Sequence, residues 1–280
     1  MTVRPINLDY TLGCGQVFRW KKLGRSWIGV IGSEIVRLEQ VGDTYTANGN
    51  VTEGELDKYF RHDDRIETIY ADIAKDNYIS KLVSDYSGLR LIRQDPWECS
   101  ASFILATYAN IPRIEKMIEN LCRTCGRRIA EGYYTFPTPE EIIRNDGYVR
   151  MCGLGFRYQR LLAFAERVIS NELNFDELRE IEYEECVRKL MRFEGIGNKV
   201  ADCIALFSLD HLEAFPIDVR IARAVKKNYG IEGSYRKISK FCRKYFGEYA
   251  GYAQEFIYIS EARSRGEGII PSEDTRISVP

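Results

Sequence analysis

The chain has 280 residues, of which 45% are hydrophobic and 29% are charged, and its formal net charge at pH 7 is −1. This composition is globular, which excludes global disorder, and the near-neutral charge argues against a protein that coats nucleic acid without specificity. No apolar run reaches the length that a bilayer needs and the N-terminus lacks a signal-peptide core, so we expect no membrane contact and a place in the cytoplasm, or in the nucleus of a eukaryote.

The first part of the chain predicts an antiparallel sheet with flanking helices. Gly15 and Gln16 stand just before it, and a turn is the simplest interpretation of Gly15. Helical spacing follows the sheet at 55–60 and 78–86. We therefore predict a small N-terminal sheet domain over residues 1–94. Alternating apolar residues, separated by glycine turns, indicate four strands at 17–20, 26–31, 34–38 and 44–46.

From residue 95 the spacing of apolar residues predicts helices. Asp95 and Asn110 can each cap a helix whose first turn holds a proline, and the second of these helices should end at Gly126. Tyr108 continues the apolar stripe of the first helix, which favours core packing for its ring. The eight cysteines are irregularly spaced and offer no second pair at zinc spacing, so we expect reduced thiols.

The most informative stretch is two short helices joined by Gly-Ile-Gly, at about 183–208. Gly195 and Gly197 are expected to supply the dihedral angles for a sharp reversal, and the second helix should open near Asn198. This pattern is typical of a helix-hairpin-helix, whose free N–H groups can bind a DNA phosphate. A plain helical hairpin is the alternative.

Lys199 stands at the start of the second helix, where the positive potential can lower the pKa of an amine that attacks a sugar carbon. A solvated lysine that touches phosphate is the alternative. Asp218 follows 19 residues later, and the chain between them is long enough to bring the two side chains together. Asp218 can also cap the next helix, which should end at Gly230. The basic residues from 219 to 247 suit phosphate contact or a merely solvated face.

The last helix is predicted at about 250–262, and it places Gln254 and Tyr258 on one face. The segment after Arg263 carries no motif. Taken together, six segments resemble the helix-hairpin-helix DNA glycosylases, and within them the 8-oxoguanine DNA glycosylases, in the order that the family has them. They are 8–20, 95–113, 153–157, 195–203 (Gly-Ile-Gly-Asn-Lys-Val-Ala-Asp-Cys), 215–220 and 251–258.

The resemblance implies a role for each motif. The Gly15 carbonyl, with Gln16 beside it, accepts the hydrogen bond from N7–H of the oxidised base. Gln254 reads the Watson–Crick edge of that base, and Cys203 and Tyr258 stack on its two faces. The resemblance further implies DNA contacts by Tyr108, Asn110, Arg113, Phe156, Arg157, Gly195, Gly197, Asn198 and Arg220.

Three of these DNA contacts have more specific roles in the resembling enzymes. Arg113 matches the residue that contacts the opposing cytosine. Phe156 and Arg157 match an aromatic wedge and an arginine that probes the opposing base. Tyr108 stands where many members carry the asparagine that fills the gap left by the flipped base, so this chain departs from the family pattern at the residue that bears on opposing-base preference.

We predict an α+β fold, with the small sheet domain at 1–94, a larger helical glycosylase domain at 95–280, and the site in the cleft between them. The expected activity is base-excision repair by a monomer that flips 8-oxoguanine, opposite cytosine, out of double-stranded DNA. Lys199, assisted by Asp218, would cleave the N-glycosidic bond through a Schiff base and nick the strand by β-elimination. No cofactor or metal is required. Relatives suggest a monovalent ion at the backbone carbonyls of Met191, Phe193 and Ile196.

Two other functions are considered. A related glycosylase for other damaged purines, such as alkylated ones, would need the aspartate but no lysine nucleophile, and Lys199 speaks against it. A DNA-binding module without catalysis would explain the hairpin and the basic residues. It would not explain why Gln16, Cys203, Asp218 and Gln254 accompany them.

Overall fold

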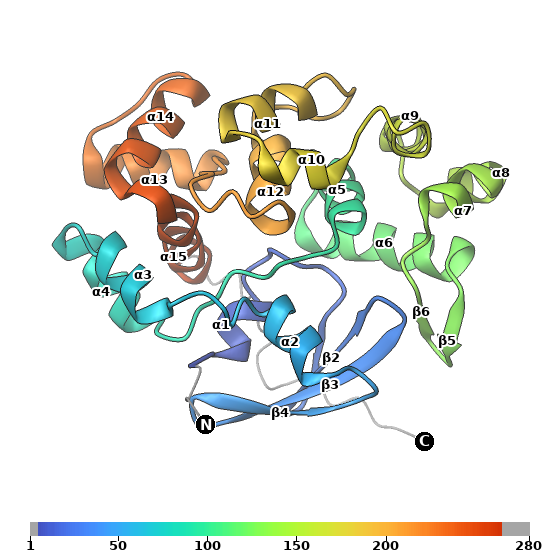
Figure 1. Cartoon of the computed structure of the whole chain (residues 1–280), viewed down its shortest axis with the longest axis horizontal. Helices are drawn as coiled ribbons and strands as arrows, with labels where there is room; N and C mark the ends of the chain where they lie inside the picture. Colours follow the sequence, from blue (N-terminus) through green and yellow to red (C-terminus); the bar gives the residue numbers. More distant parts are fainter. Residues whose placement is uncertain (1–4, 265–280) are drawn as a thin grey trace.

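The computed structural model describes residues 5–264. Residues 1–4 and 265–280 lie outside the described residues. The first range begins the segment that lacks a signal-peptide core, and the second makes up nearly all of the motif-free segment after Arg263. Within residues 5–264, no helix is both long enough and apolar enough to cross a membrane. Figure 1 shows a small sheet at one end of the molecule and helices that make up the rest.

The sheet is antiparallel, and its strands follow one another in chain order, β1-β2-β3-β4. Ile28 pairs with Arg37, and Leu38 pairs with Ala47, so each turn joins neighbouring strands. The strands are β1 (Lys21–Leu23), β2 (Ser26–Ile31), β3 (Glu34–Val41) and β4 (Thr44–Asn48). The α+β fold with an N-terminal antiparallel sheet is confirmed.

The strand predicted at 17–20 was wrong, because the ladder begins only at Lys21. The apolar residues of this segment bridge two cores and do not mark one face of a strand. Val17 and Trp20 pack into the small core beside the sheet, whereas Phe18 packs into the large helical core. Burial in two directions therefore imitates the alternation of a strand.

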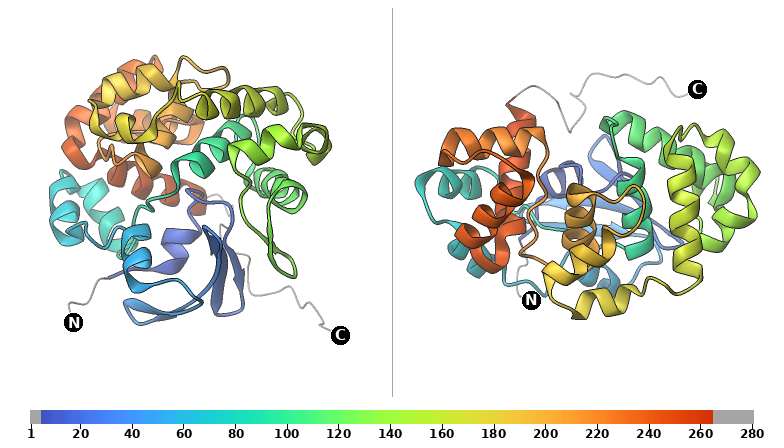
Figure 2. Two further views of the ribbon diagram at one scale, coloured as in Figure 1. Left: turned by 45° about the vertical axis from the view of Figure 1, so that its right-hand side comes forward. Right: turned by 90° about the horizontal axis from the view of Figure 1, so that it is seen from above.

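The helices fall into groups on either side of α12, as the view from above in Figure 2 shows. The α12 helix packs against α5 and α11, and α15 packs against α3, α4 and α13. The helices before α10 are α1 (Leu8–Leu12), α2 (Glu53–Tyr59), α3 (Ile66–Ile73), α4 (Asn77–Asp85), α5 (Pro96–Leu105), α6 (Ile111–Cys125), α7 (Pro139–Arg144), α8 (Asp146–Val149), η1 (Arg150–Cys152) and α9 (Arg157–Ile169). The later ones are α10 (Phe175–Glu180), α11 (Tyr183–Leu190), α12 (Asn198–Ser208), α13 (Val219–Tyr229), α14 (Tyr235–Phe246), η2 (Gly247–Tyr249) and α15 (Ala250–Arg263).

Capping residues set several helix boundaries where the sequence predicted them. Asp95 and Asn110 each accept a backbone N–H bond at the start of α5 and α6, and each helix has a proline in its first turn. The α6 helix ends before Gly126, and α13 ends at Gly230, whose backbone adopts the left-handed helical conformation. A short hairpin of β5 (Arg128–Ala130) and β6 (Tyr133–Tyr134) was not predicted.

Core packing for Tyr108 was also wrong. The α5 helix ends at Leu105, and Tyr108 lies in the following turn with φ at 53° and its side chain 89% exposed. The chain must reverse here to reach the Asn110 cap of α6, so the apolar stripe of α5 stops before Tyr108.

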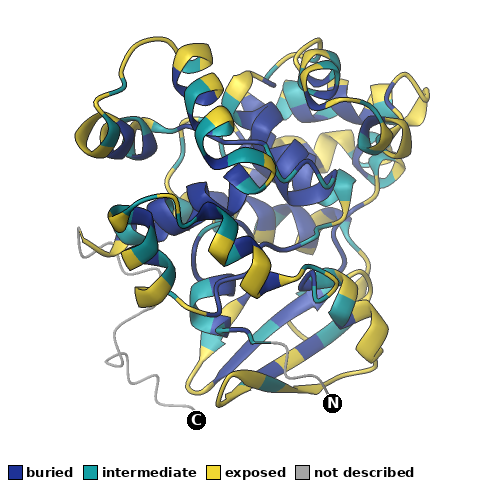
Figure 3. Ribbon diagram, turned by 60° about the vertical axis from the view of Figure 1, so that its left-hand side comes forward, coloured by how far each residue is buried: buried dark blue, intermediate teal, exposed yellow. Residues whose placement is uncertain are grey.

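Buried residues concentrate in the middle of the helical part, as Figure 3 shows, and a smaller buried cluster lies on the sheet. The small cluster joins Leu8 and Leu12 of α1 to Trp27 and Leu38 of the sheet. Residues of α3 and α4 belong to the large cluster, although they precede residue 95 in the chain. The division into domains at residue 94 therefore stays a prediction. All eight cysteines are buried free thiols, as expected.

Candidate active site

The hairpin between α11 and α12 presents the start of α12 to the site. Gly195 has φ at 90°, and a β-carbon there would lie 2.6 Å from Cδ of Arg160, so both its conformation and its contact require glycine. The expectation for Gly197 was wrong, because its φ of −93° is one that any residue adopts. Gly197 is the N-cap of α12 and, like Asn198, is exposed, which leaves the first N–H groups of the helix without a side-chain cap.

Lys199 lies in the first turn of α12 and is half-buried. Its Nζ atom is 4.9 Å from the centre of the Phe103 ring, and the Cys203 thiol lies one turn further along α12 in the same pocket. Burial raises the pKa of Cys203 to about 12, although the charge of Lys199 opposes that rise. The thiol is therefore neutral where it lines the pocket beside Lys199.

Asp218 caps α13, as the sequence allowed. Its Oδ1 atom accepts N–H bonds from Arg220 at 2.9 Å and from Ile221 at 2.8 Å. The same carboxylate lines one pocket with Lys199. The chain between the two residues has therefore returned to the start of α12, and Asp218 both caps a helix and faces the amine.

The pocket has a volume of about 70 Å³ and is built from the segment after α1, from α5, α12 and α15, and from the residues before α13. All seven residues that the resemblance assigned to catalysis or base recognition line it. They are Gly15, Gln16, Lys199, Cys203, Asp218, Gln254 and Tyr258, and Cys14, Phe103, Phe207, Pro216 and Glu255 complete the wall.

Gln254 is the side chain best placed to bind a ligand. It is 4% exposed, and its Oε1 atom is buried without a hydrogen-bond partner among residues 5–264. Leaving a buried acceptor unpaired costs about 1–3 kcal/mol, so a bound molecule that donates to it recovers this energy. Gly15, with φ at 84°, lies opposite Tyr258, and a β-carbon on Gly15 would lie 3.4 Å from the tyrosine hydroxyl.

Gln16 lines the pocket, but its amide is engaged with the backbone. Its Nε2 donates to the carbonyls of Thr11 and Arg90 at 2.8 and 2.9 Å, and its Oε1 accepts from Ile92 at 2.8 Å. These bonds tie the loop that carries Gly15 to the strand-like segment before α5. In this structure Gln16 positions the Gly15 carbonyl and has no donor left for a base.

The predicted DNA contacts divide into exposed residues and one buried arginine. Tyr108 and Phe156 are 89% and 51% exposed, and their ring centres are 6.4 Å apart. Arg157 is only 2% exposed. Its guanidinium donates to the Thr107 carbonyl, through Nε at 2.8 Å, and lies 4.3 Å from the centre of the Phe156 ring. Arg157 therefore supports the two exposed aromatic rings from beneath.

The remaining predicted contacts surround the same face. Asn110 caps α6, and Arg113 is exposed on its first turn. Arg220 donates to the Tyr258 hydroxyl at 3.2 Å, so it restrains one wall of the pocket. Among residues 5–264, no three His, Cys, Asp or Glu side chains gather in a metal-ligand group. The carbonyls suggested for a monovalent ion, at Met191, Phe193 and Ile196, belong to the turn that leads into α12.

Both the sequence and the fold of this chain are similar to those of known proteins. Residues 1–99 match the family model of the 8-oxoguanine DNA glycosylase N-terminal domain. The chain is 30% identical to the N-glycosylase/DNA lyase OGG1 of Arabidopsis thaliana, over 93% of this chain and 79% of that protein. The chain belongs to the 8-oxoguanine DNA glycosylase/lyase family.

Solved structures of this glycosylase/lyase family share the whole fold. The Clostridium acetobutylicum 8-oxoguanine glycosylase/lyase, in complex with double-stranded DNA that contains cytosine opposite 8-oxoguanine, is 31% identical and has a TM-score of 0.87 over 93% of each chain. MBOgg1 in complex with a low-affinity DNA ligand is 32% identical, with a TM-score of 0.88 over 95% of this chain and 94% of that chain. The predicted family, fold and enzyme class, a bifunctional N-glycosylase/DNA lyase, are confirmed.

Sequence reasoning missed Glu255 in this glycosylase/lyase site. The side chain is 2% exposed, and burial raises the pKa of its carboxyl to about 7, against the opposing effects of the Cys14 thiol and the Lys199 charge. The α15 helix is buried on nearly all sides, and a carboxyl in such a helix is rare unless it is paired or functional. A carboxyl in an otherwise buried helix was the signal by which Glu255 could have been predicted.

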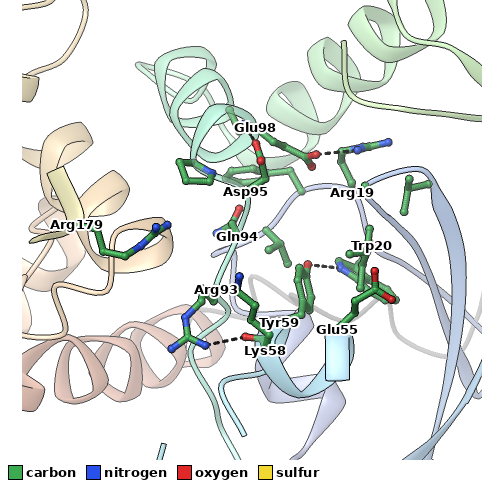
Figure 4. Close-up of a pocket in the computed structure, with 17 residues that line it drawn as sticks. Arg19, Trp20, Glu55, Lys58, Tyr59, Arg93, Gln94, Asp95, Glu98 and Arg179 are labelled. Carbon is green, nitrogen blue, oxygen red and sulfur yellow. Dashed lines mark hydrogen bonds and ion pairs between the residues drawn. The ribbon is translucent and has the colours of Figure 1, made fainter. Parts of the chain in front are cut away.

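A larger cavity of about 290 Å³ lies elsewhere, between the sheet, α2 and α5 (Figure 4). Several of its polar groups are paired with one another. Arg19 pairs with Glu98 at 3.0 Å, and the Trp20 indole donates to Tyr59 at 2.8 Å. None of the proposed catalytic residues of the glycosylase/lyase site lines this cavity. The smaller pocket is therefore the candidate active site, because it gathers all seven residues that the resemblance assigned to catalysis and base recognition.

Proposed function

We propose that this protein excises 8-oxoguanine from double-stranded DNA in base-excision repair and then cleaves the strand at the abasic site. The observation that carries the proposal is the buried, unpartnered Oε1 of Gln254 in the same pocket as Lys199. The Watson–Crick edge of a guanine offers N1–H and an amino group to such an acceptor. The oxidised base carries an additional N7–H, which guanine lacks, and the Gly15 carbonyl is the acceptor assigned to it.

The target base must leave the duplex to reach this pocket, at a cost of about a few kcal/mol that stacking and hydrogen bonds in the pocket offset. Tyr258 and the neutral Cys203 thiol are the two surfaces between which the base stacks. Tyr108 and Phe156 fill the space that the base vacates, since both rings are exposed and held together over Arg157. The uncapped N–H groups at Gly197 and Asn198 bind a phosphate of the same strand.

The chemistry needs only groups of this chain. The Lys199 amine attacks C1′ of the flipped nucleotide, and the electron pair of the glycosidic bond leaves with the base. Asp218, fixed by two helix N–H bonds, stabilises the positive charge that develops on the sugar. The nitrogen lone pair then displaces O4′ from C1′, which opens the sugar ring, and a proton from the nitrogen passes to O4′. The sugar is held as an imine on Lys199, and loss of a 2′ proton expels the 3′ phosphate by β-elimination.

The partner is double-stranded DNA with 8-oxoguanine opposite cytosine, the pairing found in the complex of the Clostridium acetobutylicum relative. Arg113 is the exposed cation assigned to that cytosine. Tyr108 stands where many family members carry an asparagine. The preference for cytosine as the opposing base is therefore the property in which this enzyme is expected to differ most from those members. One chain supplies every pocket residue, and we propose that it acts as a monomer.

The test is release of the free base from duplexes that contain 8-oxoguanine, guanine or 3-methyladenine. We expect release of 8-oxoguanine only, and a large loss of release in Gln254→Ala. Gln159→Ala is the matched control, because Gln159 is exposed on α9. Equal release of the alkylated purine, or full activity of Gln254→Ala, would contradict the proposed substrate.

A further inference from the structure

The active-site pocket holds a second carboxyl that the mechanism above does not use. Glu255 lies beside Gln254 on α15 and lines the pocket together with Lys199 and Asp218. Among the described residues, Lys199 is the only cation that acts on this carboxyl, and the Cys14 thiol lies beside it in the pocket. A carboxyl that is 2% exposed and has no arginine partner is costly to keep ionised.

Asp218 is less suited to take a proton from Lys199. Its Oδ1 atom accepts two N–H bonds at the start of α13, and protonation of this carboxylate would weaken the cap. Hydrogen bonds to the charged form of a carboxylate favour that form. Asp218 is therefore committed to the start of α13, whereas Glu255 is in surroundings that favour the neutral acid.

We propose that Glu255 is the proton acceptor that converts the Lys199 ammonium into the attacking amine. The inference rests on the function proposed above and deepens it. An N–H bond of the ammonium breaks, an O–H bond forms on Glu255, and the freed electron pair on nitrogen forms the bond to C1′. The electron pair of the glycosidic bond, which joined C1′ to the base, leaves with the base, so no further reactant is needed.

Binding of the base drives the transfer. Before a base binds, Lys199 and Glu255 line the same pocket, which water can enter. A flipped base expels that water, and in a dry pocket a neutral amine and a neutral acid are favoured over two charges. The attacking amine is thus formed when a flipped nucleotide is bound, and Asp218 remains available to stabilise the positive charge on the sugar.

The two thiols and the tyrosine hydroxyl around Glu255 stay neutral at physiological pH and do not compete for the proton. Burial raises the pKa values of the Cys14 thiol, the Cys203 thiol and the Tyr258 hydroxyl. The charged neighbours are therefore Lys199 and Asp218 alone among the titratable groups that line the pocket. The titratable groups that face Glu255 are Cys14, Lys199, Cys203, Asp218 and Tyr258.

The test is the pH dependence of single-turnover excision of 8-oxoguanine by the wild type, Glu255→Gln and Glu255→Asp. At neutral pH we expect Glu255→Gln to be slower by about 10²-fold, the usual contribution of a positioned base. The gap should narrow as the pH rises, because hydroxide then removes the lysine proton. Glu255→Asp keeps a carboxylate and should recover part of the rate at neutral pH.

Two results would overturn the proposal. One is a pH profile of the excision rate for Glu255→Gln that has the same shape as the wild-type profile, either at the full rate or lowered by the same factor at every pH. The other is an equal loss in Glu255→Asp and Glu255→Gln, since shape alone would then explain both. Binding of each variant to a duplex with a tetrahydrofuran abasic-site analogue shows that it is folded.

Borohydride cross-linking of the wild type tests the lysine nucleophile separately from the role of Glu255 as proton acceptor. A wild type that cross-links, together with a parallel Glu255→Gln profile, leaves the lysine mechanism intact and rejects only the role of Glu255. A wild type that excises the base without a cross-link rejects the lysine nucleophile, and with it the acceptor.

Discussion

Replacing Glu255 with glutamine is expected to stabilise the folded protein above neutral pH while it lowers activity. The folded carboxyl holds its proton up to a pKa of about 7, whereas the ordinary value is 4.5. Its contribution to stability is therefore fully present below 4.5 and is lost as the pH rises from 4.5 to about 7. Glutamine resembles the neutral acid at every pH, so the Glu255→Gln variant does not lose this stability as the pH rises.

The difference between the two pKa values corresponds to roughly 3 kcal/mol, at about 1.4 kcal/mol per pKa unit. Urea unfolding at about pH 8 should show a gain of that order for Glu255→Gln, and the gain should shrink toward about pH 5. Glu248→Gln is the control, because Glu248 is exposed in η2. A Glu255→Gln variant no more stable than the wild type at the higher pH would refute the inference that burial raises the pKa of this carboxyl.

Three further predictions concern packing and the DNA face. Gly251→Ala would place a β-carbon against Cδ1 of Leu206, and overpacking should lower the free energy of unfolding by about 1–3 kcal/mol in a urea titration; an unchanged midpoint would contradict the tight α12–α15 contact. Tyr108→Ala should leave stability within about 0.5 kcal/mol but weaken binding to abasic-analogue DNA by about 1–3 kcal/mol, measured by fluorescence anisotropy; unchanged affinity would remove Tyr108 from the interface. Arg157→Met leaves the Thr107 carbonyl unpaired and should cost about 1–3 kcal/mol of stability by thermal unfolding; no loss would mean that the buried arginine does not support the turn.

Local signals in the sequence were enough for most of the helical part. Asp95, Asn110 and Gly230 are capping residues that act on their own neighbours, so the helix boundaries could be predicted without knowledge of the fold. The meeting of Lys199 and Asp218 also followed from the length of chain between them, although the role of each residue came from the family resemblance.

The errors arose where tertiary structure overrides a local pattern. Val17 and Phe18 alternate because they enter two different cores, which no spacing rule distinguishes from a strand. Tyr108 leaves its stripe because the chain must turn before the next cap. The burial of Arg157 and of Glu255 depends on which helices pack together, so their surroundings could not be predicted from neighbours in the sequence.

Attack of Lys199 on the sugar is tested most directly by borohydride trapping on a duplex with 8-oxoguanine opposite cytosine. Borohydride reduces an imine between the amine and C1′ to a permanent cross-link, which shifts the protein on a denaturing gel. We predict a cross-link for the wild type and none for Lys199→Gln, with both proteins binding the duplex. A cross-link of equal yield in Lys199→Gln, or no cross-link from a wild type that binds the duplex tightly, would contradict the lysine mechanism.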